Sequence, residues 1–464
     1  MQIMARVIGS LALALACTYA FAQNAALPMP PSGVIGVQDA MLSPDYWIAK
    51  LHAPDTVLMS RAQIDAQNRR MFDTDPSMYD LQRIGPTLNR AQVASWIRKV
   101  SRMPDKTLLD EHDQPIPAAT LNAIVSNVAL DQIPAQVTAR YGLTVHRVSL
   151  RSFPTKLRAF PGKGLQDFEA FQESALFPGD PVAIVHTSLD GQWFFIVSPR
   201  YAAWVESSAI AVGHRDDVLA YAAKAPYRVV TGDKLRTVYT PEAPDVSELQ
   251  LDMGTRIPLA QLPPDQPVNG EGPYESWTLN LPVRASDGSL RFQPALLQRK
   301  LDSNADYLPL TQANIVRQAF KFLGERYGWG HLYNGRDCSG FVSDVYRSMG
   351  VQMPRNTGDQ SRSPVLHFRA FTDQDDHAAR MQAIAEAQVG DLIYIPGHVM
   401  IFLGWNDGQP YVIHDVGGLV FRDAGGKMRW TKTNEVSVTP LLPLLISDKL
   451  SYVDAITSIV RIRP

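Results

Sequence analysis

The sequence has very little cysteine and almost no net charge. Its 464 residues include only two cysteines, and the formal net charge is −2. Broad binding to nucleic acid needs a strong basic excess, which this chain lacks. No segment beyond the first 22 residues is long and apolar enough to predict a membrane helix. The sequence therefore argues against a nucleic-acid-binding protein and against an integral membrane protein.

Residues 1–22 have the layout of a secretory signal peptide. Arg6 precedes a short apolar run over residues 7–17, and a small-x-small cleavage site follows at residues 20–22. Cys17 would permit a lipid anchor, but Ala14 stands where lipoprotein signals usually carry leucine, so cleavage after the signal is favoured over lipidation. We expect an exported protein of the periplasm or cell envelope.

Cleavage of that signal would leave Cys338 as the single cysteine. Exported proteins usually use their cysteines in pairs, and a lone cysteine cannot form an intramolecular disulfide. Cys338 is therefore either an inert buried thiol, which is the usual fate of a free cysteine, or a nucleophile.

The pattern of apolar residues predicts a multidomain α+β protein. Residues 23–40 are rich in Pro, Ala and Gly and predict a flexible leader, whereas residues 41–134 have apolar residues at helical spacing and predict a helical N-terminal domain. Residues 135–215 and 216–300 change to period-two alternation with hairpin signals, which predicts two small β-barrels. Residues 301–464 predict an α+β unit with helices first and an antiparallel sheet after them.

Cys338 lies at the predicted start of an amphipathic helix, directly after a glycine-rich segment. Asp337 can cap this helix, and Cys338 then falls in its first turn. There the helix dipole and the free backbone N–H groups favour an anion, which predicts a lowered thiol pKa and a site for an oxyanion. This position favours the nucleophile over the inert thiol.

A thiol nucleophile needs a base, and two histidines on neighbouring predicted strands can provide it. His398 opens the predicted strand 398–405 directly after Gly397, although a surface histidine is the alternative interpretation. His414 follows 16 residues later on the next strand and could orient His398. Asp415 is adjacent but should point to the opposite face of that strand, so we prefer His414 as the third group.

Other arrangements of reactive residues are missing from the sequence. It contains no His-Glu-x-x-His, no other histidine spacing typical of a metal site, no Gly-x-Ser-x-Gly and no glycine-rich phosphate loop with Lys-Ser/Thr. We therefore expect no metal and no cofactor.

Residues from about 311 to 464 resemble the NlpC family of papain-like cell-wall cysteine peptidases. The resemblance rests on five motifs, namely Asp337 to Phe341, Met353-Pro354-Arg355, Gly390-Asp391-Leu392, Gly397-His398-Val399 and His414. It implies a catalytic triad of Cys338, His398 and His414, with Tyr327 shaping the oxyanion site. The family often reads Trp-Gly-Gly where this chain has Trp329-Gly330-His331, so His331 is a departure.

The order of a helical region, two barrels and an NlpC-type domain resembles a subgroup of envelope peptidases whose barrels are bacterial SH3-like domains. Members of this subgroup cleave γ-D-glutamyl–meso-diaminopimelate bonds in peptidoglycan stem peptides that have a free N-terminal L-alanine. The resemblance implies that Asp337 and Ser339 bind the free amine and that Tyr201, from the first barrel, closes that end of the pocket. Tyr201-Ala-Ala-Trp departs from the usual Tyr-Pro-Gly-Trp or Tyr-x-Gly-Trp.

The resemblance implies a cysteine peptidase that recycles stem peptides. Two alternatives stay open, a broad lytic endopeptidase acting on intact wall and a wall-binding scaffold with an inactive catalytic domain. The complete set of one cysteine and two histidines argues against the inactive scaffold.

Overall fold

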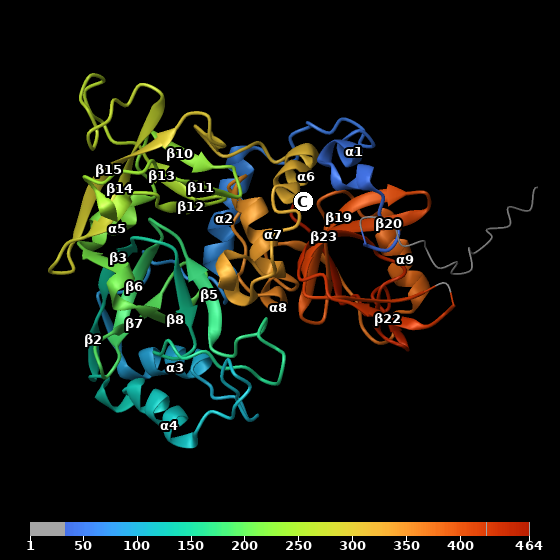
Figure 1. Cartoon of the computed structure of the whole chain (residues 1–464), viewed down its shortest axis with the longest axis horizontal. Coiled ribbons are helices and arrows are strands. Elements are labelled where there is room, and N and C mark those ends of the chain that lie inside the picture. Colours follow the sequence, from blue (N-terminus) through green and yellow to red (C-terminus); the bar gives the residue numbers. More distant parts are fainter. Residues whose placement is uncertain (1–32, 424, 464) are drawn as a thin grey trace, which may run out of the picture.

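The computed structural model describes residues 33–423 and 425–463 of the chain. The predicted signal peptide, the first part of the predicted leader and Cys17 lie outside the described residues. Within the described ranges, no helix has both the length and the apolar character needed to cross a membrane. Two β-rich units lie on one side of the molecule and a six-stranded sheet lies on the other, with helix α7 (Cys338–Arg347) between them (Figure 1).

The N-terminal region contains short helices joined by irregular segments, and its interpretation as one helical domain stays a prediction. Its elements are η1 (Asp39–Leu42), α1 (Pro44–Ile48), α2 (Arg61–Thr74), β1 (Thr87–Asn89), α3 (Arg90–Val100), α4 (Ala118–Asn127) and η2 (Leu130–Gln132). A capping box between Ser60 and Gln63 begins α2.

These helices are divided between two hydrophobic cores. Trp47 and Met71, from α1 and α2, pack into the core that also contains Phe341 of α7. Val93 of α3 packs instead with Trp204 of the following β unit. Residues 41–134 therefore contribute to two neighbouring units rather than to one core of their own.

The end of the predicted leader is packed against the C-terminal unit. Ile35 and Val37 are buried, and the hydroxyl of Tyr411 donates a hydrogen bond to the carbonyl of Gly36 at 2.7 Å. The prediction of a flexible leader was wrong for residues 33–40, because two apolar side chains among them enter the hydrophobic core.

The first β unit is a seven-stranded antiparallel sheet in the order β5-β4-β8-β7-β6-β3-β9. Its elements are β2 (Gln136–Thr138), β3 (Arg140–Thr144), β4 (Val148–Arg151), β5 (Gln172–Leu176), β6 (Pro181–Thr187), β7 (Trp193–Val197), β8 (Ala202–Glu206), η3 (Ser207–Ala209) and β9 (Ile210–Gly213), of which β2 pairs with β1. Alternate residues of β7 face different cores, with Phe195 packing toward α3 and Ile196 packing on the other face.

The second β unit consists of three small sheets around one shared core. Its elements are α5 (Arg215–Tyr221), β10 (Tyr227–Val230), β11 (Lys234–Arg236), η4 (Pro244–Val246), β12 (Gln250–Asp252), β13 (Arg256–Pro258), β14 (Ser276–Arg284), β15 (Leu290–Gln298) and β16 (Ser303–Asn304). The interpretation of this region as a second SH3-like barrel stays a prediction.

The C-terminal unit is an α+β arrangement around a six-stranded sheet in the order β17-β26-β18-β19-β20-β23. Its helices are α6 (Gln312–Phe320), η5 (Trp329–Asn334), α7, α8 (Thr357–Gln360) and α9 (His377–Glu386). Its strands are β17 (His367–Ala370), β18 (Leu392–Ile395), β19 (His398–Asn406), β20 (Gln409–Val416), β21 (Leu419–Arg422), β22 (Met428–Thr431), β23 (Glu435–Pro440), β24 (Leu445–Ser447), β25 (Leu450–Ser451) and β26 (Ser458–Arg461).

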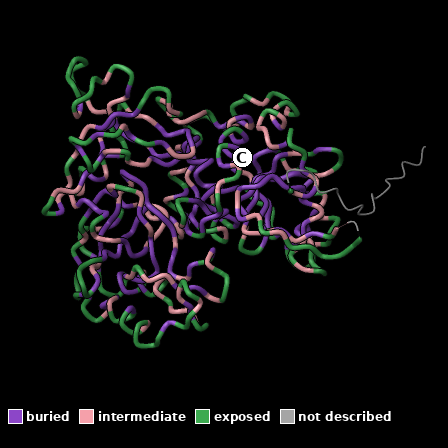
Figure 2. The backbone as a smooth tube through the Cα atoms, viewed as in Figure 1, coloured by how far each residue is buried: buried purple, intermediate pink, exposed green. Residues whose placement is uncertain are grey.

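Helices α6 and α7 cover one face of the six-stranded sheet, where Val345 packs with Ile401 and Ile413. The other face packs against α9, where Ile384 lies with Phe402. Figure 2 shows buried backbone running from the β units through α7 into this sheet. The start of α7 therefore lies at the junction of the units.

Candidate active site

Cys338 is the first residue of α7, as the sequence predicted. The Asp337 side chain caps the helix, because its Oδ1 accepts a hydrogen bond from the backbone N–H of Gly340 at 2.8 Å. Cys338 is 5% exposed, and its sulfur lies 3.9 Å from the carbonyl oxygen of Gly397, the residue before His398. The fold therefore brings the thiol to the start of β19.

The prediction of a lowered thiol pKa was wrong. Burial raises the pKa of the Cys338 thiol to about 12, the charge of Asp337 acts in the same direction, and the backbone N–H of Val399 only partly opposes them. The sequence places the thiol at a helix start, but it does not show how completely the fold removes the sulfur from water. The thiol is therefore protonated at neutral pH and needs a base at the moment it reacts.

The two histidines form a hydrogen-bonded chain that ends at a threonine. Nε2 of His398 lies 2.7 Å from Nδ1 of His414, and Nε2 of His414 lies 3.0 Å from Oγ1 of Thr439. Burial lowers the pKa of His398 to about 4, and burial together with the charge of His398 lowers the pKa of His414 well below its usual value. Both rings are therefore neutral at pH 7.

Neutral rings fix which nitrogen should carry each proton. For His398 to accept a proton on Nδ1, its Nε2–H must donate to Nδ1 of His414. His414 then carries its proton on Nε2 and donates to the hydroxyl of Thr439, which is fully buried on β23. Thr439 was not singled out from the sequence, because its position depends on the register between β20 and β23.

Tyr327 and Asp415 lie near the same thiol without joining the histidine chain. Tyr327 is buried, and burial followed by the charge of Cys338 raises its pKa, so its hydroxyl stays a hydrogen-bond donor. Asp415 is also buried, and within the described residues neither of its carboxylate oxygens has a hydrogen-bond partner. Burial, followed by the charge of Glu325, raises the pKa of Asp415 well above its usual value, so this carboxyl is held neutral.

Asp337 and Ser339 are both engaged by a buried arginine. The guanidinium of Arg355 donates to Oδ2 of Asp337 at 2.8 Å and to Oγ of Ser339 at 2.9 Å. It also donates to Oγ of Ser174, on β5, at 2.8 Å. From the sequence, Asp337 is expected to bind the substrate amine. In the structure Arg355 already neutralises this carboxylate, so an amine would have to compete with Arg355 for it.

Tyr201 lies on the first β unit and pairs with a carboxylate that sequence reasoning missed. Its hydroxyl donates to the side chain of Glu173, and both residues are half-buried. Burial raises the pKa of Glu173 to about 7. Glu173 directly precedes Ser174, which contacts Arg355, so the pair lies next to the polar group around Asp337. No sequence signal distinguished Glu173 from an ordinary strand residue.

The loop before Cys338 has an unusual backbone. His331, Tyr333 and Asn334 have φ values of +69°, +54° and +56°, in the left-handed region that side chains other than glycine rarely adopt. The family's glycine at the position of His331 would take this conformation freely. The ring of His331 packs against Gly340, where an added Cβ would lie only 2.6 Å from the ring.

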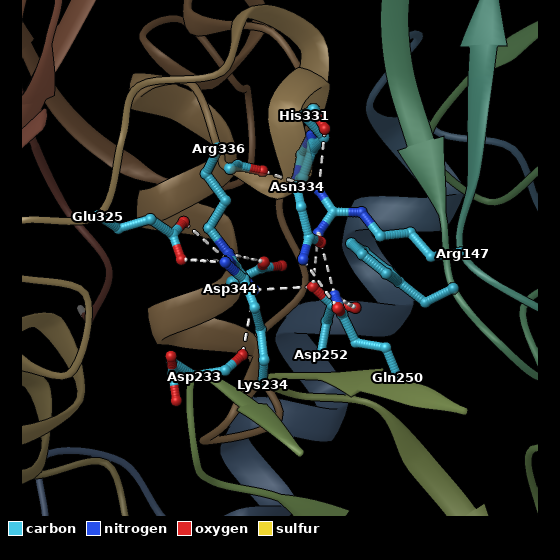
Figure 3. A network of polar contacts seen from close by, with 12 residues as sticks. Arg147, Asp233, Lys234, Gln250, Asp252, Glu325, His331, Asn334, Arg336 and Asp344 are labelled. Atoms are coloured by element: carbon cyan, nitrogen blue, oxygen red, sulfur yellow. Dashed lines mark hydrogen bonds and ion pairs between the residues drawn. The ribbon is translucent and has the colours of Figure 1, made fainter. Parts of the chain in front are cut away.

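The first β unit holds this loop in place, in part through Arg147 (Figure 3). Arg147 donates to the carbonyls of His331 at 2.9 Å and Gly335 at 2.7 Å, and Gln172 donates to the carbonyl of Gly330 at 2.7 Å. These bonds from the first β unit compensate for the backbone strain of the loop.

A fully buried arginine lies beneath the same loop. Arg336 contacts Asp344 at 2.7 Å, Glu325 at 2.9 Å and Asp252 at 3.1 Å (Figure 3). Asp252 belongs to the second β unit and also pairs with Arg147 at 3.0 Å. One charged cluster therefore joins all three units next to the nucleophile. No group of three or more His, Cys, Asp or Glu side chains suited to a metal ion occurs in the described ranges.

Two family models match this chain. Residues 324–436 match the NlpC/P60 family, and residues 158–206 match an SH3 domain of the SH3b1 type. The SH3 match covers part of the first β unit. The NlpC/P60 match covers Cys338, His398 and His414.

Known relatives cover parts of the chain. A γ-D-glutamyl-L-lysine dipeptidyl-peptidase of Bacillus subtilis (strain 168) is 27% identical over 167 residues, which are 34% of this chain and 47% of that protein. A probable endopeptidase p60 of Listeria seeligeri is 34% identical over 98 residues, which are 19% of this chain and 16% of that protein. The chain thus spans about half the length, or less, of these relatives.

A solved structure shares the fold over most of the chain. The structure of an NlpC/P60 endopeptidase from Photobacterium damselae subsp. piscicida superposes with a TM-score of 0.70 and covers 90% of this chain and 96% of its own. The sequences are 16% identical, so the likeness shows the fold alone.

Proposed function

This chain carries an NlpC/P60 peptidase domain together with an SH3 domain of the SH3b1 type, and from this premise we propose that it is a cysteine peptidase of peptidoglycan stem peptides. The bond cleaved is γ-D-glutamyl–meso-diaminopimelate, in peptides with a free N-terminal L-alanine. Its place of action is the cell envelope, where its substrate occurs. The observation that carries the proposal is the chain from His398 through His414 to Thr439, which begins directly after Gly397, whose carbonyl oxygen lies 3.9 Å from the Cys338 sulfur.

The chemistry follows from the protonation states of the free site. The sulfur of Cys338 attacks the γ-glutamyl carbonyl carbon while its proton moves to Nδ1 of His398. The backbone N–H groups at the start of α7 and the hydroxyl of Tyr327 stabilise the oxyanion. His398 then protonates the leaving amine, and water hydrolyses the thioester to restore the thiol.

The free amine of the substrate is assigned to the side chains of Glu173 and Tyr201. Arg355 neutralises Asp337, whereas Glu173 is half-buried and is hydrogen-bonded to the Tyr201 hydroxyl. An ammonium placed beside Glu173 would supply the missing positive charge. Asp337 and Ser339 then contribute indirectly, because their side chains hold Arg355 in position. The names of two relatives specify a γ-D-glutamyl bond, which supports the substrate class.

The substrate range separates recycling from lysis of intact wall. We expect the enzyme to hydrolyse L-Ala-γ-D-Glu-meso-diaminopimelate and to leave purified sacculi intact, as measured by chromatography of the released products. The N-acetylated tripeptide serves as the matched control because it lacks the ammonium. Release of peptides from sacculi at a comparable rate would favour the lytic alternative.

Replacing Glu173 with glutamine should remove the preference for the free amine. We expect kcat/KM for the free tripeptide to fall by about 100-fold, since a buried charged contact is worth roughly 2–3 kcal/mol. Turnover of the acetylated peptide should not change. The pKa of Glu173 is raised to about 7, so the carboxyl is neutral below that pH. The KM of the wild type for the free peptide should therefore decrease as the pH rises through about 7.

The matched control is Glu111→Gln, at an exposed glutamate in the segment before α4. It should retain both the preference and the pH dependence of the wild type. If Glu173→Gln keeps the pH-dependent KM, Glu173 does not bind the amine.

Replacing Thr439 with valine should weaken catalysis without affecting substrate binding. Valine cannot accept the hydrogen bond from His414, so the buried ring loses the partner that fixes its tautomer. We expect kcat to fall about 10-fold, KM to stay unchanged and the acidic limb of the kcat/KM profile to shift. Thr439→Ser keeps the hydroxyl and should restore the wild-type profile. Equal profiles for the valine and serine variants would show that Thr439 has no positioning role.

A further inference from the structure

A cavity of about 210 Å³ lies where the two β units meet the peptidase domain, outside the histidine chain. Four arginines line it, one from the first β unit, one from the second and two from the peptidase domain, namely Arg200, Arg256, Arg347 and Arg355. Asp180 is the only acidic residue among the described residues that line it. The cavity wall is therefore strongly cationic.

The positive charges in this wall exceed the negative charges that balance them. Asp337 neutralises Arg355, and Asp180 lies 3.5 Å from Arg347. Arg256 donates to backbone carbonyls of the segment before β10 and stacks on the ring of Tyr227, and its charge also acts on Asp306. Across the described residues, Arg200 makes no hydrogen bond and no close ion pair, and only the more distant charges of Asp344 and Asp180 stabilise its charged form. Four arginines thus line the cavity against the single carboxylate of Asp180, so positive charge exceeds negative charge in the wall.

Two buried polar atoms in the wall also lack partners. Nη1 of Arg347 and Oγ1 of Thr255 are inaccessible to water and make no hydrogen bond within the described part of the chain. Burial and the nearby charge of Arg347 lower the pKa of Arg200 to about 10. Buried polar groups in native proteins are normally satisfied, so two residues beside the cavity carry polar atoms that no group in the described residues meets.

We propose that this cavity binds a small oxyanion of the phosphate or carboxylate class. Arg200 and Arg347, which line the cavity, provide the charge. The planar guanidinium suits two-point contacts with such oxyanions. A water molecule takes roughly 30 Å³ in the liquid, so the cavity has room for one phosphate or one small dicarboxylate.

The site is distinct from the proposed substrate pocket but is connected to it. Arg355 lines the cavity and also contacts Asp337 and Ser339, the two neighbours of Cys338. Arg355 would therefore interact both with an anion in the cavity and with the residues at the start of α7. The site does not depend on the proposed function, because it can be tested without any substrate.

The test measures anion binding to the full-length protein without substrate. Sodium phosphate and sodium succinate are titrated separately by calorimetry and by thermal unfolding, with ionic strength held constant by sodium chloride. We expect saturable binding and a rise in melting temperature with at least one of the two anions. The anion that binds with the higher affinity shows whether the site prefers phosphate or carboxylate. Absence of saturable binding for both would overturn the proposal.

Arg200→Gln should lower the affinity at least 10-fold. Because the arginine has no hydrogen bond or close ion pair to lose within the described residues, the variant should melt no lower than the wild type when no anion is present. Arg200→Lys keeps the positive charge and should retain binding. It gives a second test if Arg200→Gln does not fold. Arg98→Gln, at an exposed arginine of α3, is the matched control and should bind as the wild type does. Unchanged affinity in Arg200→Gln would overturn the proposal.

Discussion

Replacing Cys338 with alanine should abolish hydrolysis of the tripeptide, with kcat lowered about 10⁴-fold or more. The thiol is the group that attacks in the proposed reaction, and removal of a nucleophile typically leaves only the contribution of binding and oxyanion stabilisation. The side chain is small and buried, so alanine should change the free energy of unfolding by only about 1 kcal/mol. Steady-state kinetics and a thermal melt measure the two effects separately.

Cys338→Ser is the matched control because it keeps the size of the side chain and replaces the sulfur with a poorer nucleophile. It should be folded and equally inactive. Unchanged turnover in either variant would overturn the enzymatic proposal and favour a wall-binding scaffold.

The pH dependence of the wild type provides an independent check on the thiol. Its pKa is raised to about 12, so alkylation by iodoacetamide should be slow at pH 7 and should accelerate as the pH rises. The base must be neutral to accept a proton, and the pKa of His398 is lowered to about 4. We therefore expect kcat/KM to fall as the pH decreases through about 4.

The local structure around the nucleophile could be predicted from the sequence. The cap at Asp337 and the helix that starts at Cys338 depend on residues within a few positions of each other. The same is true of the strand that begins at His398, because a period-two pattern is a local property. These predictions were confirmed.

The partners of the N-terminal helices could not be predicted in this way. Helical spacing identifies Trp47 and Val93 as apolar positions, but it does not show which surface covers them. The structure buries Trp47 against the peptidase domain and Val93 against the first β unit. A periodic pattern determines that a face is buried, whereas the fold determines what buries it.

The polar surroundings of the site depend on contacts between distant segments. Arg355 and Ser174 are 181 positions apart, and Tyr201, which precedes β8, meets Glu173 of β5. Such pairs become visible only when the registers and the packing of the units are known. The direction of the thiol pKa shift has the same origin, because burial at the junction outweighs the effect of the helix start.

Replacing Arg336 with leucine should destabilise the protein more than any other single substitution considered above. Arg336 is fully buried and pairs with three carboxylates, which raise its pKa above the usual value. Breaking a buried ion pair by removing one partner typically costs about 3–5 kcal/mol, because the remaining charges are left uncompensated. Lys234 would still pair with Glu325 and Arg147 with Asp252, whereas Asp344 would lose its ion pair.

Urea unfolding at several pH values distinguishes this mechanism from a simple packing defect. In Arg336→Leu, the buried Asp344 carboxylate would be left without its ion-pair partner, so its ionised form would destabilise the folded state. The stability deficit relative to the wild type should therefore be largest at neutral pH and shrink as the pH falls. Adding Asp344→Asn should recover part of the lost stability, although Asp344→Asn alone should destabilise the wild type. A deficit that is constant with pH, or one that the second substitution enlarges, would contradict an origin in unpaired charge and would assign the loss to packing around the loop.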